Sequence, residues 1–123
     1  MKKILLVDDE KSFIDIIQIL LQKNGYDIIV ACDGEEALVK VRSEHPDLVL
    51  LDLIMPKMDG FTFAKTLRAA NDIPWIPVIV FTTQATEVEK QKAEKIGVQG
   101  YLMKSDINAH ALRDKIEEFI GRG

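Results

Sequence analysis

Cysteine is almost absent from this chain of 123 residues, in which Cys32 is the single example. No internal disulfide can form, and a reducing cytoplasm is the expected setting. Long apolar runs are missing as well, and none reaches the roughly 18 residues that suggest a membrane-spanning helix. The run that follows the basic start, Ile4 to Val7, is too short for the core of a secretory signal peptide.

The common nucleotide-binding and hydrolase motifs are also missing. The sequence has no G-x-x-x-x-G-K-[ST] loop, no G-x-G-x-x-G turn and no G-x-S-x-G elbow. Its two histidines, His45 and His110, lie too far apart for a metal-ligand pair, and we expect both at the surface. A net charge of −4 without a basic stripe argues against direct nucleic-acid binding.

What remains is the composition of a soluble globular protein, with 47% hydrophobic and 29% charged residues, and we expect one domain over residues 1–123. Short apolar runs alternate with amphipathic stretches. The predicted strands are 4–7, 27–32, 47–51, 76–82 and 101–103. The predicted helices are 11–24, 35–43, 61–70, 86–96 and about 107–120. This alternation predicts an α/β fold, in which a parallel sheet carries helices on both faces.

Some positions within these elements carry expectations of their own. Cys32 is expected to be a small buried strand residue. Asp106 is expected to cap the N-terminus of the last helix. The spacing of five apolar residues predicts that the first helix faces the core through Phe13, Ile16, Ile17, Leu20 and Leu21.

Polar side chains follow the ends of most predicted strands. Asp8 and Asp9 follow the first strand and Asp52 the third, while Thr82 closes the fourth and Lys104 follows the fifth. Ligands of open parallel sheets bind beyond the carboxyl ends of the strands. If the first and third strands are neighbours, three carboxylates converge there, and a hard cation such as Mg²⁺ would stabilise them.

An acid, a hard metal, a lysine and a hydroxyl together suit phosphoryl transfer. Asp52 is the best candidate for a nucleophile that forms an acyl phosphate, because it stands alone, whereas Asp8 and Asp9 form a pair suited to a metal. Each residue taken alone has an ordinary explanation: a helix cap or turn for the acids and Thr82, a surface position for Lys104. The prediction depends on their conjunction at one edge of the sheet.

Four segments then carry a family resemblance: "ILLVDDE", "LVLLDLIMPKMDG", "PVIVFTT" and "GYLMKS". In this order they resemble the signatures of response-regulator receiver domains, the CheY-like receivers of two-component signalling. The resemblance extends from Lys3 to Ile120. It implies a flavodoxin-like doubly wound (βα)5 fold with strand order 2-1-3-4-5.

The resemblance also implies a site. Asp52 would accept a phosphoryl group, in the presence of Mg²⁺, from a histidine kinase or a histidine phosphotransfer protein. Asp9, Asp52 and the backbone carbonyl of Ile54 would bind the metal directly, and Asp8 would bind it through water. Lys104 would pair with the phosphoryl group.

The resemblance further implies a switch rather than an enzyme that turns over an external substrate. Thr82 would move to bond a phosphoryl oxygen, and the rotamer of Tyr101 would be coupled to that movement. The output face would be formed by the fourth helix, the fifth strand and the fifth helix.

One departure and two alternatives accompany this interpretation. Ser105 follows Lys104 where the family usually has a proline after a cis bond. Because a cis bond before another residue costs about 2.5–4 kcal/mol, the peptide here can be trans. A Mg²⁺ phosphatase with an aspartyl nucleophile is one alternative, although Ile54 stands where such enzymes place a second acid. A docking module without phosphorylation is the other, and the intact acid set argues against it.

Overall fold

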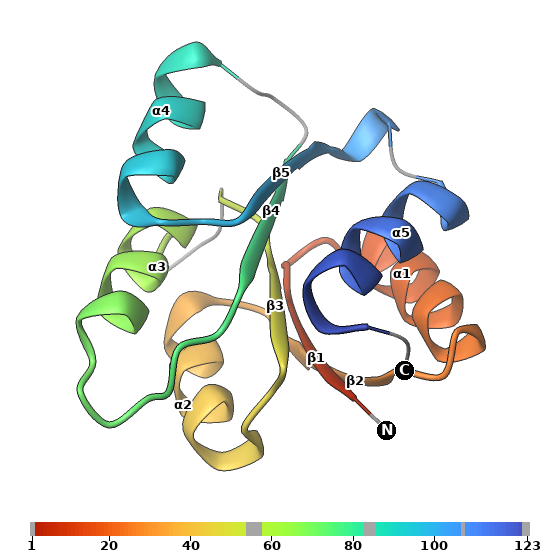
Figure 1. The fold of residues 1–123 in the computed structure, drawn as a ribbon, viewed down its shortest axis with the longest axis horizontal. Helices are drawn as coiled ribbons and strands as arrows, with labels where there is room; N and C mark the ends of the chain where they lie inside the picture. Colours follow the sequence, from red (N-terminus) through yellow and green to blue (C-terminus); the bar gives the residue numbers. More distant parts are fainter. Residues whose placement is uncertain (1, 54–57, 83–85, 107, 122–123) are drawn as a thin grey trace.

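Five parallel strands form one sheet in the computed structural model, which describes residues 2–53, 58–82, 86–106 and 108–121. Their order is β2-β1-β3-β4-β5, as the family resemblance implied. The strands are β1 Lys3–Val7, β2 Asp27–Ala31, β3 Leu48–Leu51, β4 Val78–Thr82 and β5 Gly100–Met103 (Figure 1). The predicted α/β class and strand order are therefore confirmed.

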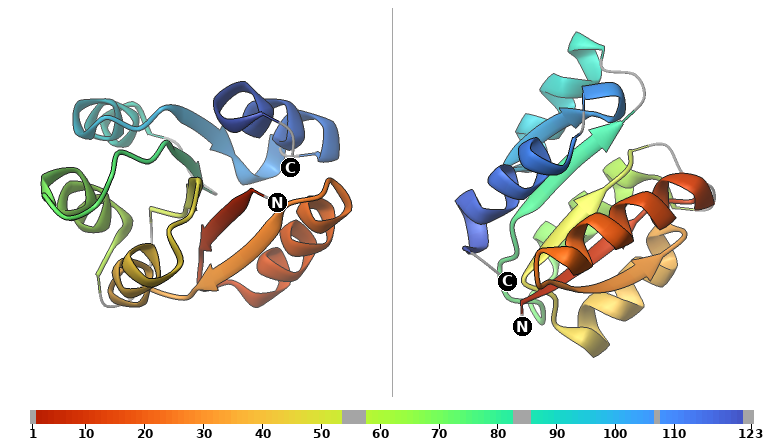
Figure 2. Two further views of the ribbon diagram at one scale, coloured as in Figure 1. Left: turned by 60° about the horizontal axis from the view of Figure 1, so that its bottom comes forward. Right: turned by 90° about the vertical axis from the view of Figure 1, so that its right-hand side faces the viewer.

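Helices cover both faces of the sheet. Helices α2, α3 and α4 lie on one side of it and α1 and α5 on the other, with the two termini close together at one end (Figures 1 and 2). The helices are α1 Lys11–Lys23, α2 Gly34–Glu44, α3 Gly60–Ala69, α4 Glu87–Ile96, α5 Ala109–Ile120 and the 3₁₀ turn η1 Lys104–Asp106. None of the helices in the described ranges has both the length and the apolar character needed to cross a membrane.

The central strands are buried on both faces, which explains their uninterrupted apolar sequences. Successive side chains of a strand point to opposite faces. In β1, Leu5 and Val7 join the core under α2 and α3, whereas Ile4 and Leu6 join the core under α1 and α5. All four are fully buried. Because both faces of such a strand are packed in a core, the strand holds an acid that directly follows it in a fixed position at the edge of the sheet.

Three local predictions are wrong. In α1, Ile14 is buried in place of Ile16, which is 58% exposed, because only one stripe of this surface helix meets the sheet. Cys32 is exposed, since β2 ends one residue earlier, at Ala31. Asn108, and not Asp106, caps α5 by accepting a hydrogen bond from the amide of Ala111, because Asp106 belongs to the 3₁₀ turn.

Arg68 of α3 ties two loops together, the one before β4 and the one before β5, at the end of the sheet opposite the strand-end acids. Its guanidinium donates hydrogen bonds to the carbonyl of Ile76 at 2.8 Å, to the carbonyl of Gly97 at 3.0 Å and to Oε1 of Gln99 at 2.9 Å. It also lies 5.3 Å from the ring centroid of Trp75. One side chain thus holds the start of β4 and the turn before β5 against α3.

Replacing Arg68 by methionine should therefore lower the free energy of unfolding by about 2–3 kcal/mol. The hydrogen bonds from the charged guanidinium are lost, and the oxygens that accepted them lose their donor. Urea unfolding followed by circular dichroism measures this change. Lys65→Met on the exposed face of the same helix is the control and should unfold at nearly the wild-type urea concentration. Equal stability of the two variants would show that Arg68 does not tie these loops together.

Candidate functional site

The pairing of β1 with β3 brings two acids together. Val7 and Leu51 are partners in the parallel register, and each is followed by an aspartate. The side chains of Asp8 and Asp52 are buried at this edge, whereas Asp9 is exposed. Carboxylate oxygens of all three lie within 4.8 Å of one another. The convergence of Asp8, Asp9 and Asp52 expected from the strand ends is present.

Helix capping does not account for these acids. The N-cap of α1 is Glu10, and it makes no side-chain cap hydrogen bond. Asp8 instead accepts a hydrogen bond from the backbone amide of Glu10 at 2.9 Å, which fixes one of its oxygens. By contrast, Asp59 caps α3 by accepting a hydrogen bond from the amide of Thr62 at 2.9 Å. Helix capping therefore explains Asp59 and does not explain why the three acids of the cluster converge.

Lys104 supplies the positive charge of the site. Its Nζ lies 2.8 Å from Asp8 Oδ2, 3.3 Å from Asp52 Oδ2 and 3.7 Å from Glu10 Oε2, and its side chain is only 7% exposed. Burial lowers the pKa of this ammonium, but the contacts with Asp8 and Asp52 outweigh burial and hold the pKa above its ordinary value. Lys104 is therefore charged and compensates the two buried carboxylates.

The side chain of Lys104 crosses the edge of the sheet in contact with two phenylalanine rings. Lys104 follows β5, while Asp52 follows β3, so the lysine must reach over β4 to meet the acids. Its Nζ lies 4.4 Å from the ring centroid of Phe13 and 5.6 Å from that of Phe81. The rings are themselves in contact, with centroids 5.0 Å apart. Ring faces attract cations, so these phenylalanines favour the position that Lys104 takes.

Sequence reasoning missed this contribution of Phe13 and Phe81. It assigned Phe13 to the helix core and gave Phe81 no separate role. Phe81 immediately precedes the polar residue Thr82 at the end of β4. An aromatic residue at that position, beside a predicted acid cluster, was the available signal.

The turn after Asp52 depends on a glycine. The amide of Gly60 donates a hydrogen bond to the carbonyl of Leu53 at 3.0 Å. A Cβ at position 60 would come within 2.6 Å of the Asp52 carbonyl oxygen and of the Leu53 Cα, closer than real contacts allow. The "DG" that ends the stretch "LVLLDLIMPKMDG" therefore caps α3 and lets that helix pack against the backbone of Asp52.

The predicted switch residues are described in part. Thr82 ends β4 at the same edge, but its side chain is outside the described part of the structure, as is the whole of Ile54. Tyr101 of β5 is half-buried, and no described residue hydrogen-bonds its buried hydroxyl. Burial, with the Glu89 carboxylate as a smaller cause, raises the pKa of the Tyr101 phenol. The roles of Thr82, Ile54 and Tyr101 stay predictions.

The bond after Lys104 is trans. The described residues contain no cis peptide bond, and Lys104 and Ser105 open the 3₁₀ turn η1. The ammonium of Lys104 nevertheless reaches the acids, so the serine in place of the family's usual proline does not displace the lysine from the site.

The donor set fits a divalent metal ion. Three carboxylates and one ammonium leave an excess of negative charge, and every candidate ligand atom is an oxygen. Such ligands suit hard divalent cations. The exposed Asp9 leaves one side of the cluster accessible to solvent.

Comparison with known proteins identifies the family to which this chain is similar. Residues 4–117 match the family described as "Response regulator receiver domain". The chemotaxis protein CheY4 of Vibrio cholerae is 33% identical, with a TM-score of 0.89 and coverage of 97% of this chain and 98% of that one. A two-component response regulator from Clostridium difficile is 28% identical, with a TM-score of 0.89 and coverage of 98% and 96%.

Relatives in sequence are longer than this chain. The alkaline phosphatase synthesis transcriptional regulatory protein PhoP of Bacillus subtilis is 42% identical over 103 residues. That match covers 84% of this chain but 42% of the relative. The chain therefore spans about two fifths of the curated relatives that it matches.

Proposed function

Because this chain belongs to the response regulator receiver domain family, we propose that it is a phosphorylation switch whose acceptor is Asp52. The observation that carries the proposal is the buried Asp52 carboxylate, which lies 3.3 Å from Lys104 Nζ and inside a cluster of three acids. A neighbouring cation favours the ionised form of a carboxylate, and the ionised form is the nucleophile. A histidine kinase or a histidine phosphotransfer protein is the proposed donor.

The proposed step forms one bond and breaks one. An Asp52 carboxylate oxygen attacks the phosphorus of the donor, a P–O bond forms, and the bond from phosphorus to the donor breaks with its electron pair on the departing group. Lys104 reduces the repulsion between the anionic nucleophile and the phosphoryl oxygens. We propose that Asp9, Asp52 and the Ile54 carbonyl hold Mg²⁺, with Asp8 bound through water. When bound, Mg²⁺ supplies further neutralisation of the phosphoryl charge.

The product changes the electrostatics of the edge. A phosphoryl group adds about −1.5 to −2 charge and three acceptor oxygens. Lys104 already contacts Asp52, so it is placed to follow the added charge, and we propose that Thr82 and Tyr101 respond with it. The proposed output face is α4, β5 and α5, which lie next to these residues in the fold. The response shifts a two-state equilibrium.

A small phosphodonor tests the proposal. Incubation with acetyl phosphate and Mg²⁺ should add one phosphoryl group per chain, seen by intact mass. Chelation of the metal with EDTA should abolish the addition, because Lys104 alone leaves the acidic cluster with an excess of negative charge that repels the phosphoryl oxygens. Asp9→Asn should need a higher Mg²⁺ concentration than wild type. The proposal fails if labelling is indifferent to EDTA. Sustained turnover of p-nitrophenyl phosphate would favour the phosphatase alternative instead.

A further inference from the structure

A second feature of the surface lies between α3 and α4, which pack side by side (Figures 1 and 2). The two helices enclose a groove of about 210 Å³. Its lining comes from both helices and consists of Phe61, Lys65, Lys92, Lys95 and Ile96. None of these residues belongs to the acidic cluster at the strand ends, so the groove needs its own explanation.

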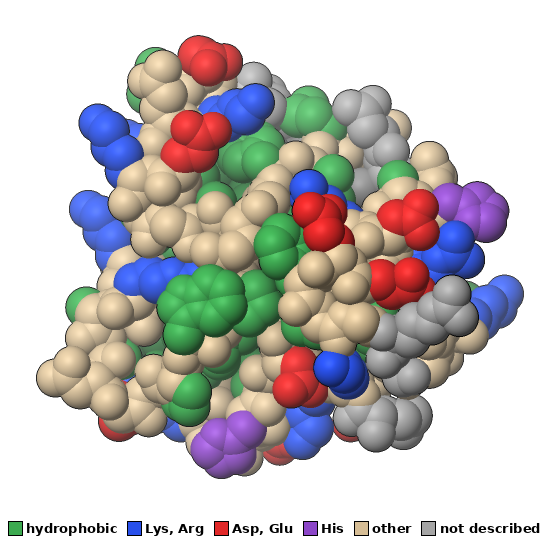
Figure 3. Space-filling model, viewed as in Figure 1, with side chains coloured by type: hydrophobic (Ala, Val, Ile, Leu, Met, Phe, Trp, Pro, Cys, Tyr) green, Lys and Arg blue, Asp and Glu red, His purple; other side chains and the backbone are tan. Residues whose placement is uncertain are grey.

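The groove combines an apolar floor with a cationic rim. Phe61 and Ile96 are half-buried and pack against the core under α2 and α3. The three lysines are exposed, and within the described part of the chain none of them forms an ion pair. The ammonium of Lys92 lies 5.4 Å from the ring centroid of Phe61. Figure 3 shows basic side chains gathered along the edge of the molecule formed by α3 and α4.

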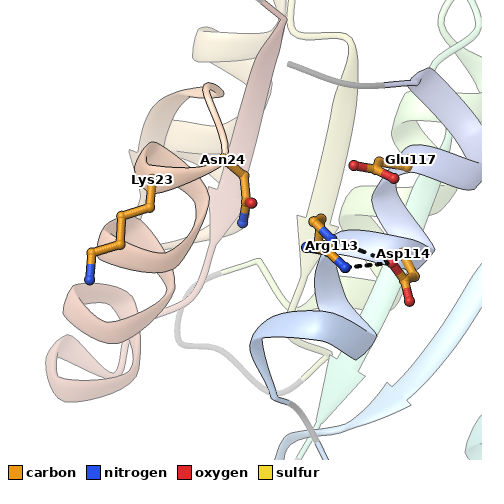
Figure 4. A pocket seen from close by; sticks show the side chains of 5 residues that line it. All are labelled: Lys23, Asn24, Arg113, Asp114 and Glu117. Atoms are coloured by element: carbon orange, nitrogen blue, oxygen red, sulfur yellow. Dashed lines mark hydrogen bonds and ion pairs between the residues drawn. The ribbon is translucent and has the colours of Figure 1, made fainter.

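Two other cavities lack this one-sided charge. The cavity between α1 and α5 carries two cations and two anions, and there Arg113 pairs with Asp114 at 3.3 Å (Figure 4). The cavity on the opposite flank of α4, over β5, is lined by Lys90 and Lys115 but also by Glu94. In the first cavity the charges balance; in the second, Glu94 lies beside the two lysines and Lys115 pairs with Glu118 at 3.7 Å. The α3–α4 groove leaves three positive charges uncompensated in a chain whose net charge is −4.

We propose that the α3–α4 groove binds an acidic segment of a partner protein, which inserts one large apolar side chain between Phe61 and Ile96. The three lysines match carboxylates on either side of that anchor, and the volume has room for one such side chain. Val88, which is 66% exposed one turn before Lys92, extends the apolar strip along α4. The proposal is independent of phosphorylation at Asp52.

A synthetic peptide is the probe. It has about twelve residues, with glutamates flanking one central phenylalanine, and carries fluorescein for anisotropy measurements. We expect saturable binding at about 0.15 M salt that weakens as salt is raised. Amide shifts in the NMR spectrum should concentrate on α3 and α4. Exchange of the central phenylalanine for glutamine should weaken binding at least about tenfold, because the anchor is lost.

Matched protein variants separate the groove from net charge. Lys92→Glu together with Lys95→Glu should weaken binding at least about tenfold, since two rim cations become anions. Lys11→Glu together with Lys23→Glu makes the same change in net charge on α1 and should change the affinity less than about twofold. All four positions are exposed, and retained circular dichroism spectra show that folding is intact.

Several results would overturn the proposal. One is the absence of binding across a panel of such peptides that differ in the anchor residue. Another is equal binding of the glutamine peptide or of a single-stranded oligonucleotide of the same charge, which would make the groove a general polyanion patch. Shifts confined to β5 and α5 would place the peptide elsewhere. Self-association of the chain through α3 and α4 that the peptide does not displace would assign the groove to a second copy.

Discussion

Asp52→Asn is expected to lose phosphoryl incorporation from acetyl phosphate by at least about 1,000-fold, while the protein stays folded. The amide cannot act as the nucleophile, and removal of a nucleophile typically costs more than this factor. The fold should survive because asparagine has nearly the same shape and because the change removes one of three converging negative charges. Intact mass reports the incorporation, and thermal unfolding reports the fold.

The control for this variant lies seven residues later in the same stretch of sequence. Asp59→Asn also exchanges an acid for its amide, but Asp59 serves as the N-cap of α3 and asparagine caps helices equally well. This control should be labelled at the wild-type rate. If Asp52→Asn is also labelled at that rate, Asp52 is not the acceptor. Peptide mapping of the phosphate would then identify the acid that accepts it.

The position of the strand-end acids could be predicted because it depends on whole strands and on their alignment in the sheet. The apolar runs that precede Asp8 and Asp52 are each long enough to identify a buried strand, and a parallel sheet aligns the carboxyl ends of its strands. The register, in which Val7 is opposite Leu51, then decides that the two acids are neighbours. Lys104 was predicted in the same way, as the first residue after the fifth strand.

Features that depend on one residue or one rotamer could not be predicted. The strand assignment at Cys32 was one residue too long, and that alone turned an exposed residue into a predicted buried one. Asp106 and Asn108 both suit an N-cap, and only the 3₁₀ turn decides between them. The contact of Lys104 with Phe13 depends on the packing of α1 and on the rotamers of a long side chain.

The position of Lys104 leads to the second prediction. In EDTA, Lys104→Met should lower the free energy of unfolding by about 3 kcal/mol, the lower end of the range for removing one partner of a buried ion pair. The lower end is appropriate because Asp9 and Glu10 at the rim are exposed and admit water. Asp8 is fully buried and loses the cation 2.8 Å away. Urea unfolding in EDTA measures this effect.

Lys11→Met removes the same charge from an exposed position and is the control. Lys11 contacts Asp15 at 3.6 Å, and both side chains are exposed, so its loss should leave the unfolding midpoint nearly unchanged. Equal midpoints for Lys104→Met and Lys11→Met in EDTA would mean that Lys104 is not the counter-ion of the buried acids.

Addition of Mg²⁺ distinguishes a counter-ion from a lysine that only fills space. A bound ligand stabilises the folded state according to its affinity, and a cation binds more tightly where a neighbouring cation has been removed. Excess Mg²⁺ should therefore stabilise Lys104→Met more than it stabilises wild type and recover part of the lost stability. A purely packing role for Lys104 predicts the same gain from Mg²⁺ in both proteins. A smaller gain in the variant would show that Lys104 assists metal binding instead of competing with it.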